Sequence, residues 1–452
     1  MNKYALYCLG IAALLSGCGG SGSASHTPAA EPVVAASTDA VPDEPSLLAH
    51  PDDAPLPDAD DMADATAGPA VFTLAGYAAE GAAELADAAS AIDDASPPLA
   101  SLAASAATNL YVAPAGSDSN PGTASQPFRS LARAAKAVRP GTKVFVAPGM
   151  YSGGFRTSIS GTAAARIVFL STVKWGANIV PPKYSASKVA WDNRGSHVDI
   201  VGFEIDGSAY QGGVRWAHGI YNGGSYDAIR NNHVHHIAQG IGCTGAGGAA
   251  IGVDSYYRGA QADVIANLVH DIGPAGCRFI HGIYVSTSGR IKNNVVYRVA
   301  EGGIHLWHDA RNVVITNNTV TTSNTGIIVG GGNFYYSKGP NDYTSVYSNI
   351  VYDNKMGISE QGKTGLNNSY RNNLVYGNSR YDWRLNNGLR HSDTVSEAPQ
   401  LMGSSRSAAP NLRPAAGSPA IGQATAALAE TTDFEGRPRN ARAGYDIGAF
   451  QH

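Results

Sequence analysis

The feature that most constrains the fold of this chain is an internal repeat of the triplet Asn-x-Val. It recurs six times, at Asn232–Val234, Asn267–Val269, Asn294–Val296, Asn318–Val320, Asn349–Val351 and Asn373–Val375. The intervals between the valines are 35, 27, 24, 31 and 24 residues. A base period near 24 residues, lengthened by insertions, is typical of one coil of a three-sheet solenoid and not of a propeller blade or a helical repeat. The repeat therefore predicts an all-β fold, a parallel β-helix.

The asparagine of each repeat is expected at a sharp turn. Asparagine tolerates left-handed backbone geometry, and its side chain can hydrogen-bond the equivalent asparagine of the next coil. Six copies in register predict an asparagine ladder.

A second strand of each coil is marked by a Gly-Ile-like pair, as in His218–Tyr221 and His281–Tyr284. With a period of two, the isoleucine points into the core and the next residue points outward. The first outward column then consists of Tyr221, Gly252, Tyr284, His305, Ile328 and Ser359. The next outward column consists of Gly223, Asp254, Ser286, Trp307, Gly330 and Gln361.

The N-terminus carries the features of an export signal in residues 1–18. Lys3 precedes an apolar run, Ala5 to Leu15, that is too short to anchor a chain across a bilayer. Leu-Ser-Gly-Cys, ending at Cys18, resembles the lipobox of bacterial lipoproteins, which implies cleavage before Cys18 and attachment of lipid to its sulfur. Gly19, where an inner-membrane lipoprotein would carry Asp, favours an outer-membrane lipoprotein. The alternative is an ordinary secretory signal in which Cys18 is incidental.

Export leaves two cysteines to account for, because Cys8 leaves with the signal and Cys18 is lipidated. Cys243 lies nine residues after Val234, and Cys277 lies eight residues after Val269, so both fall in the same loop of adjacent coils. Coils about 4.8 Å apart allow a disulfide between such positions. An exported chain favours oxidation, and the sequence therefore predicts a Cys243–Cys277 disulfide.

Charge divides the chain into two parts. Residues 19–108 are rich in Ala, Pro, Asp, Ser and Gly, and within them residues 31–100 hold 15 acidic and no basic side chains. Such a segment buries too little apolar surface to fold, which predicts a disordered tether. Residues 101–452 hold 31 basic and 21 acidic side chains, a net charge of +10 that would attract a polyanion. An acidic polysaccharide suits an exported protein better than nucleic acid, for which no recognition motif is present.

The remaining chain is expected to divide into an N-terminal cap with the first coils (109–190), the β-helix (191–400) and a C-terminal module (401–452). Residues 109–151 predict a strand, a turn, a short amphipathic helix within 128–138 and a second strand, and they resemble the N-terminal cap of pectate-lyase-like right-handed β-helix proteins. The stretches that begin at Gly417, Thr432 and Gly444 resemble the C-terminal module of secreted bacterial β-helix proteins. We expect this module to fold over the last coil.

Polar and aromatic side chains gather on the outward face of the coils that follow His218. Aromatic rings stack on sugars, and His, Asp and Glu hydrogen-bond hydroxyl groups. The predicted catalytic residues are His281, Tyr284, His305 and Glu301. The predicted substrate-binding residues are His218, Tyr221, Asp254, Trp307, His308 and Lys292. The alternative is that His218 and His281 are turn residues that satisfy backbone groups.

Three further interpretations stay open at this point. A zinc site would have to combine His218, His281 and His305, and calcium would need Asp254 and Glu301, but no motif demands either ion. A basic column that includes Lys292 either binds uronate carboxylates or is a solvated face. The column after each valine is expected to be an external aromatic stack that protects the sheet: His235, His270, Tyr297, Thr321, Tyr352 and Tyr376.

The resemblance to pectate-lyase-like proteins implies a polysaccharide as partner, since that fold carries lyases, hydrolases, epimerases and noncatalytic adhesins. The first hypothesis is a monomeric lyase that acts on an acidic exopolysaccharide by β-elimination, with His281 as base and Tyr284 or His305 as acid. A histidine near its ordinary pKa would suit this role. The second hypothesis is a glycoside hydrolase that uses two of Asp254, Glu301 and Asp309. The third is a noncatalytic polysaccharide-binding lipoprotein.

Overall fold

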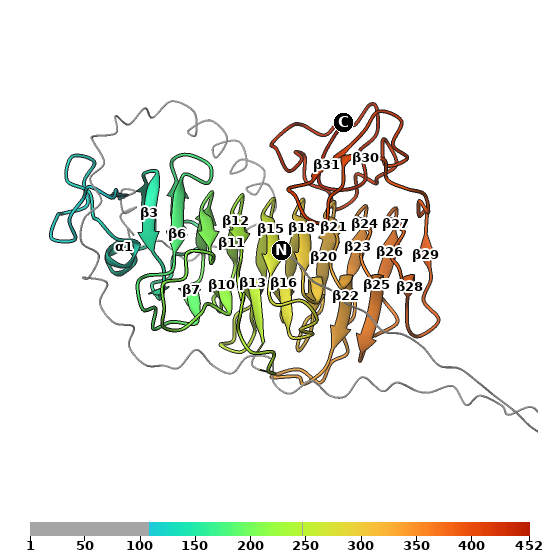
Figure 1. Ribbon diagram of the computed structural model, residues 1–452, viewed down its shortest axis with the longest axis horizontal. Helices are drawn as coiled ribbons and strands as arrows, with labels where there is room; N and C mark the ends of the chain where they lie inside the picture. Colours follow the sequence, from blue (N-terminus) through green and yellow to red (C-terminus); the bar gives the residue numbers. More distant parts are fainter. Residues whose placement is uncertain (1–107, 246) are drawn as a thin grey trace, which may run out of the picture. The chain divides into compact units, whose positions relative to one another are not determined.

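The computed structural model describes residues 108–245 and 247–452 (Figure 1). The export signal, Cys18 and the tether up to residue 107 lie outside the described residues. In the described part, no helix has the length and apolarity needed to cross a membrane.

Three parallel sheets make up the coils, and strands of one sheet recur once per coil. Sheet A contains β1 (Asn109–Val112), β2 (Lys143–Val146), β5 (Ile167–Ser171), β8 (Val198–Val201), β11 (Asp227–Arg230), β14 (Ala262–Ile265), β17 (Gly289–Lys292), β20 (Val313–Thr316), β23 (Ser345–Tyr347), β26 (Ser369–Arg371) and β29 (His391–Ser392). Sheet B contains β3 (Gly149–Ser152), β6 (Ala177–Val180), β9 (Glu204–Asp206), β12 (His233–His235), β15 (Leu268–Ile272), β18 (Val295–Val299), β21 (Thr319–Thr321), β24 (Ile350–Tyr352) and β27 (Leu374–Tyr376). Sheet C contains β4 (Phe155–Thr157), β7 (Val189–Asn193), β10 (His218–Asn222), β13 (Gly248–Val253), β16 (Ile280–Val285), β19 (Gly302–Leu306), β22 (Thr325–Gly331), β25 (Met356–Gly362) and β28 (Tyr381–Arg384).

This arrangement confirms the predicted fold class, a right-handed parallel β-helix. The chain visits sheets A, B and C in turn, and each strand pairs with its equivalent one coil later (Figure 1). The valines of the repeat, such as Val234, Val269 and Val296, are fully buried between the sheets. The repeat thus marks the point where sheet B contributes to one continuous core.

The asparagine ladder is present and links six coils. The Nδ2 of Asn232 donates to Oδ1 of Asn267 at 3.1 Å, and Asn267 donates to Asn294 at 3.0 Å. The same bond continues through Asn318 and Asn349 to Asn373. The ladder asparagine was expected to adopt the left-handed backbone conformation. In the structure the residue before it does so instead, for example Asn293 with φ 55°. That turn leaves the ladder side chain pointing inward, where backbone groups need partners.

The N-terminal end of the coils is closed by the helix α1 (Leu131–Ala137), within the range that the sequence indicated. Ser130 caps it by accepting a hydrogen bond from the backbone N–H of Arg133. Leu131, Ala134 and Ala135 are buried in the main core. The helix therefore covers apolar side chains that the first coil would otherwise expose.

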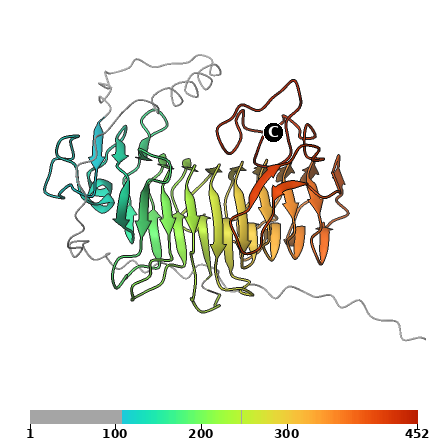
Figure 2. The same cartoon turned by 45° about the horizontal axis from the view of Figure 1, so that its top comes forward.

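The C-terminal segment corrects one expectation, because it packs along the side of the coils and not over the last one (Figure 2). It contains the two-stranded ribbon of β30 (Leu401–Gly403) and β31 (Asn411–Pro414). Arg439 donates to Asn293 in the middle of the β-helix, and the N–H of Gly448 donates to the carbonyl of Ser348. Phe434 and Phe450 pack with Tyr297 of β18. The segment therefore covers the outer face of sheet B.

The predicted disulfide is confirmed. Cys243 and Cys277 are joined, with their Cα atoms 5.4 Å apart. The bond connects the loop that follows β12 to the loop that follows β15, directly before β16 begins at Ile280. It therefore ties together the loops that precede two neighbouring strands of sheet C.

Candidate functional site

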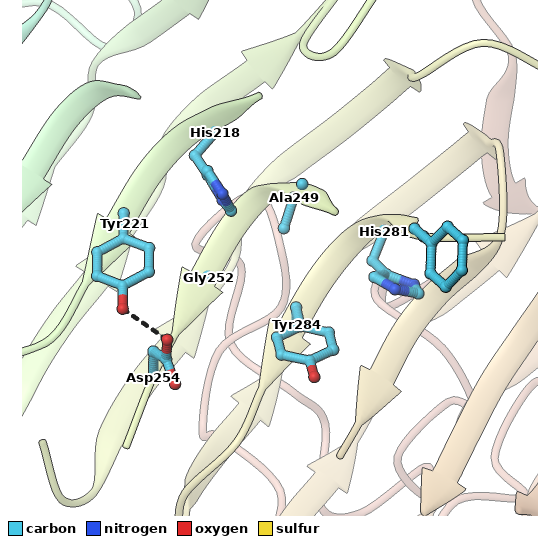
Figure 3. Close-up of a pocket in the computed structure, with 9 residues that line it drawn as sticks. His218, Tyr221, Ala249, Gly252, Asp254, His281 and Tyr284 are labelled. Carbon is cyan, nitrogen blue, oxygen red and sulfur yellow. Dashed lines mark hydrogen bonds between the residues drawn. The ribbon is translucent and has the colours of Figure 1, made fainter. Parts of the chain in front are cut away.

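A pocket lies between neighbouring strands β10, β13 and β16 on the face of sheet C that is turned away from the core (Figure 3). Ile220, Ile251 and Ile283 align across these strands and point into the core. Tyr221 and Tyr284 follow the isoleucines and therefore lie on the opposite face. The register confirms the predicted outward column, because Tyr221 pairs with Gly252, Gly252 with Tyr284 and Tyr284 with His305.

The pocket exists because small residues of β13 separate two pairs of larger side chains on β10 and β16. His218 and Tyr221 lie on one side, and His281 and Tyr284 lie on the other (Figure 3). Between them β13 contributes Gly248, Ala249 and Gly252. A Cβ added at Gly252 would lie 3.8 Å from Tyr221 and 3.9 Å from His218, so it would occupy the hollow itself. The lining glycines and Phe279 were not identified from the sequence, although the small residue between two tyrosines is visible in the predicted column.

The site is more enclosed than the outward face of a solenoid was expected to be. His218, Tyr221, His281, Tyr284 and His305 expose 5% or less of their surface. Phe279, from the disulfide-linked loop, lines the pocket. The hollow is about the size of one water molecule. A sugar unit can therefore enter only if side chains or loops around the pocket move.

The histidines of the site are neutral at pH 7, which corrects the expectation of an ordinary pKa. Burial lowers the pKa of His218 to about 4, with a further contribution from the charge of Lys188. Burial and the proximity of His218 lower the pKa of His281 to about 3. Burial lowers the pKa of His305 well below its ordinary value as well. Each imidazole therefore keeps one nitrogen lone pair as a proton acceptor.

His281 and His305 form one half of the site's polar network. Nδ1 of His305 lies 3.0 Å from Nδ1 of His281, so one of the two rings donates and the other accepts. The ring of His281 also stacks against that of Tyr284, with centroids 5.1 Å apart. The base and the acid proposed from the sequence are therefore in direct contact.

Tyr221 and Asp254 form the other half of the network. The hydroxyl of Tyr221 donates to Oδ2 of Asp254 at 2.5 Å (Figure 3). Oδ1 of Asp254 accepts from the Ser286 hydroxyl at 2.6 Å and from the N–H of Tyr256 at 3.1 Å. Burial, together with the Asp254 charge, raises the pKa of Tyr221 well above its ordinary value. Asp254 therefore orients a protonated Tyr221, and both of its carboxylate oxygens accept hydrogen bonds within the protein.

Three buried polar atoms near the site have no hydrogen-bond partner among the described residues. They are Nδ1 of His218, Nε2 of His305 and the indole Nε1 of Trp307. Buried polar groups are nearly always paired, so an unpaired one indicates water or a ligand. His218 lines the pocket, and His305 contacts the lining residues His281 and Tyr284.

Trp307 and His308 lie close to the pocket, but they are not among the residues that line it. The Trp307 ring fills the space beside Gly330, Gly332 and Gly362. His308 lies between two partners of the loop after β22, with Nδ1 2.8 Å from the carbonyl of Asn333 and Nε2 2.8 Å from the Tyr335 hydroxyl. Both ring nitrogens of His308 therefore already have partners, whereas the indole N–H of Trp307 has none among the described residues.

Lys292 and Glu301 were predicted to act at the site, but the structure places them in other networks. Lys292 ends β17 of sheet A and pairs with Glu430 of the C-terminal segment at 2.9 Å. Glu301 accepts hydrogen bonds from the side chains of Asn324 and Thr325 on the next coil. Calcium binding by Asp254 and Glu301 is also disfavoured, because each carboxylate serves a separate set of partners.

Comparison with sequence families gives limited matches. A family model described as "Protein of unknown function (DUF1565)" matches residues 114–156. The uncharacterized protein YwoF of Bacillus subtilis (strain 168) is 32% identical over 135 residues. This match spans 28% of the present chain and 29% of the relative's length.

Solved structures with a similar fold include enzymes of several kinds. The pectate lyase Pel9A is 18% identical with a TM-score of 0.48, and the similarity covers 76% of this chain and 96% of that one. A glycoside hydrolase is 9% identical with a TM-score of 0.49, covering 64% and 96% of the two chains. The A-module of the Azotobacter vinelandii mannuronan C-5 epimerase AlgE4 is 14% identical with a TM-score of 0.42, covering 58% and 68%. The similarity to these chains is one of fold alone.

Proposed function

We propose that this protein is a polysaccharide-active enzyme that cleaves a uronate-containing polymer by β-elimination in the pocket of sheet C. The observation that carries the proposal is the contact between a neutral, buried His281 and Tyr284, which both line the pocket. A neutral imidazole can accept a proton, and a tyrosine hydroxyl can donate one.

The proposed reaction divides the proton transfers between these two residues. His281 removes the proton from the carbon next to the uronate carboxylate. The electron pair forms a carbon–carbon double bond as the bond to the glycosidic oxygen breaks. Tyr284 then gives its hydroxyl proton to the departing oxygen.

His218 is the residue we assign to the uronate carboxylate. Among the described residues, neither lysine nor arginine lines the pocket, although Lys188 lies close enough for its charge to lower the pKa of His218. Nδ1 of His218 is buried without a partner among the described residues and borders the pocket. As an N–H donor it would stabilise the charge that develops on the carboxylate.

Access to the site requires the surrounding side chains or loops to move. The side chains that would react expose 5% or less of their surface. Phe279, two residues after the disulfide-bonded Cys277, lines the pocket, and movement of such loops commonly accompanies substrate binding. The net charge of +10 on residues 101–452 would raise the local concentration of an acidic polymer.

The test is the ultraviolet absorbance of the unsaturated product while the purified protein acts on a panel of uronate polymers. We expect an absorbance rise that His281→Gln and Tyr284→Phe each reduce about 100-fold or more. The exposed residues His391 and Tyr376 provide matched controls, His391→Gln and Tyr376→Phe. New reducing ends without absorbance would indicate a hydrolase instead, and binding without cleavage would indicate a noncatalytic polysaccharide-binding protein.

Anchoring at the outer membrane through Cys18 remains part of the proposal. It is supported by the sequence Leu-Ser-Gly-Cys at the end of the export signal. Growth of expressing cells with labelled palmitate should label the protein, and Cys18→Ala should abolish the label. A secreted, unlabelled wild-type protein would contradict the anchor.

A further inference from the structure

A cluster of histidines lies on the outer face of sheet B, on strands β12 and β15, beside two carboxylates of β9. His233 and His235 flank the buried Val234, so both side chains lie on the outer face. In register with them, β9 contributes Glu204 and Asp206. His270 of β15 pairs with His235. The sequence indicated an aromatic stack at this position, but neighbouring coils also bring carboxylates to it.

Three imidazoles of this cluster converge. Nε2 of His233 lies 2.7 Å from Nε2 of His270. The ring of His235 stacks on that of His270 with centroids 5.1 Å apart, and it lies 4.2 Å from the ring of His233. One nitrogen of each ring lies within 4.8 Å of the corresponding nitrogens of the other two. Three nitrogen ligands on one face are a common donor set for Zn²⁺.

Carboxylates hold two of these rings by their other nitrogen. Oδ2 of Asp271 lies 2.6 Å from Nδ1 of His270, and Arg298 fixes Asp271 with hydrogen bonds of 2.6 and 2.7 Å. Oε1 of Glu204 lies 3.5 Å from Nδ1 of His233. In metal sites, a carboxylate on the far nitrogen selects the tautomer whose free lone pair faces the ion. Nε2 of His233 and Nε2 of His270 face each other and are therefore left for a ligand, whereas Nε2 of His235 lies 3.1 Å from Oε1 of Glu204 and would share the ion with that carboxylate.

We propose that His233, His235 and His270 bind one divalent transition-metal ion of the Zn²⁺ class, with Glu204 or water completing the coordination. Imidazole nitrogen suits Zn²⁺, whereas Ca²⁺ and Mg²⁺ prefer oxygen. The side chains of the three histidines remain 10–16% exposed, so an ion can reach them from solvent. The ion would link the coils of β12 and β15. It is separate from the pocket of the proposed function, which lies on sheet C.

The test is calorimetric titration of the untagged, chelator-treated mature protein with Zn²⁺. We expect one ion per chain, and a loss of affinity of about 100-fold or more in His235→Gln and in His270→Gln. Asp271→Asn should weaken binding about 10-fold, because it removes only the orienting carboxylate. The exposed His391, which stacks on Trp383 in another part of the fold, gives the control His391→Gln, which should bind as the wild type does.

Three results would overturn this assignment. The first is no binding of Zn²⁺ by the wild type, and the second is unchanged affinity in His270→Gln. The third concerns His236, which forms a second group of candidate ligands with Asp206 and His235. If His236→Gln abolishes binding while His270→Gln does not, the ion lies in that second group. Circular dichroism of each variant, and the visible spectrum of bound Co²⁺, separate lost ligands from lost folding.

Discussion

Burial lowers the pKa of the histidines at the pocket more than neighbouring charges do. For His218, His281 and His305, removal from water is the largest cause of the lowered pKa. A neutral imidazole is the form that a general base needs, and a low pKa keeps His281 in this form throughout the neutral range while lowering its affinity for a proton. The same burial makes protonation of these residues costly to the folded state.

This burial predicts loss of stability in acid. Unfolded histidine has a pKa of about 6.5, whereas His218 and His281 titrate at about 4 and about 3 in the folded protein. Between these values the unfolded chain binds protons that the folded chain does not, so stability falls as the pH falls. Calorimetric Tm should therefore drop between about pH 7 and about pH 4.5, and the double variant His218→Gln/His281→Gln should show a shallower slope.

The exposed His452 gives a suitable control, His452→Gln, whose slope should match that of the wild type. An unchanged slope in the double variant would show that these two histidines do not account for the acid sensitivity.

At the scale of the strand and turn, the asparagine ladder connects the coils inside the core. Asn294 is fully buried and uses all of its side-chain bonding capacity toward its neighbours. Its Oδ1 accepts from the N–H and Nδ2 of Asn267, and its Nδ2 donates to the carbonyl of Val264 and to Asn318. Removal of this side chain leaves several buried groups without partners.

We expect Asn294→Ala to lower the free energy of unfolding by about 3–5 kcal/mol, because each unpaired buried group costs about 1–3 kcal/mol. The matched control is Asn367→Ala, since Asn367 is exposed and, within the described part of the chain, its side chain bonds only Asp342. Urea denaturation monitored by circular dichroism measures both variants. Equal midpoints for the two would mean that water replaces the ladder without cost.

The loops that precede β13 and β16 are joined by the disulfide Cys243–Cys277. The bond closes a segment with a sequence separation of 34 residues, which corresponds to about 3–4 kcal/mol in the chain-entropy model. We expect Cys243→Ala/Cys277→Ala to lower the Tm and to speed protease cleavage near Phe279. Mass spectrometry of early fragments identifies the cleavage site, and cleavage elsewhere first would contradict the assigned role of the disulfide.

At the scale of the whole described chain, the C-terminal segment is held to the middle coils by a buried arginine. Arg439 donates to Asn293 at 2.7 Å and to the carbonyl of Gly448 at 3.0 Å. Burial lowers the pKa of this guanidinium to about 10. Its hydrogen bonds therefore offset a considerable desolvation cost, and its loss should release the segment.

Arg439→Ala should expose the apolar surface around Tyr297 and Phe450, whereas the exposed Arg442→Ala should not. Binding of a hydrophobic dye and limited proteolysis within 401–452 provide the measurements. A variant that resists protease as the wild type does would show that the apolar contacts suffice without Arg439.

The sequence by itself determined the fold, because a β-helix repeats the same local pattern in every coil. Val234 and its equivalents, the ladder asparagines and the Gly-Ile pairs each occupy one place per turn, so spacing alone predicts register and the cysteine pair. The column with Tyr221, Gly252 and Tyr284 was predicted for the same reason.

Only the tertiary structure decided the burial, the pKa and the contact partners of the side chains in those columns. Phe279, from the loop before β16, lines the pocket, and the burial of His281 lowers its pKa, which no periodic pattern encodes. Lys292 lies on sheet A, away from the pocket of sheet C, and pairs there with Glu430 of the C-terminal segment, which is distant in sequence. The grouping of His233 with His270 depends on side-chain orientation between coils. Registers follow from local periodicity, whereas burial and charge partners depend on contacts between remote segments.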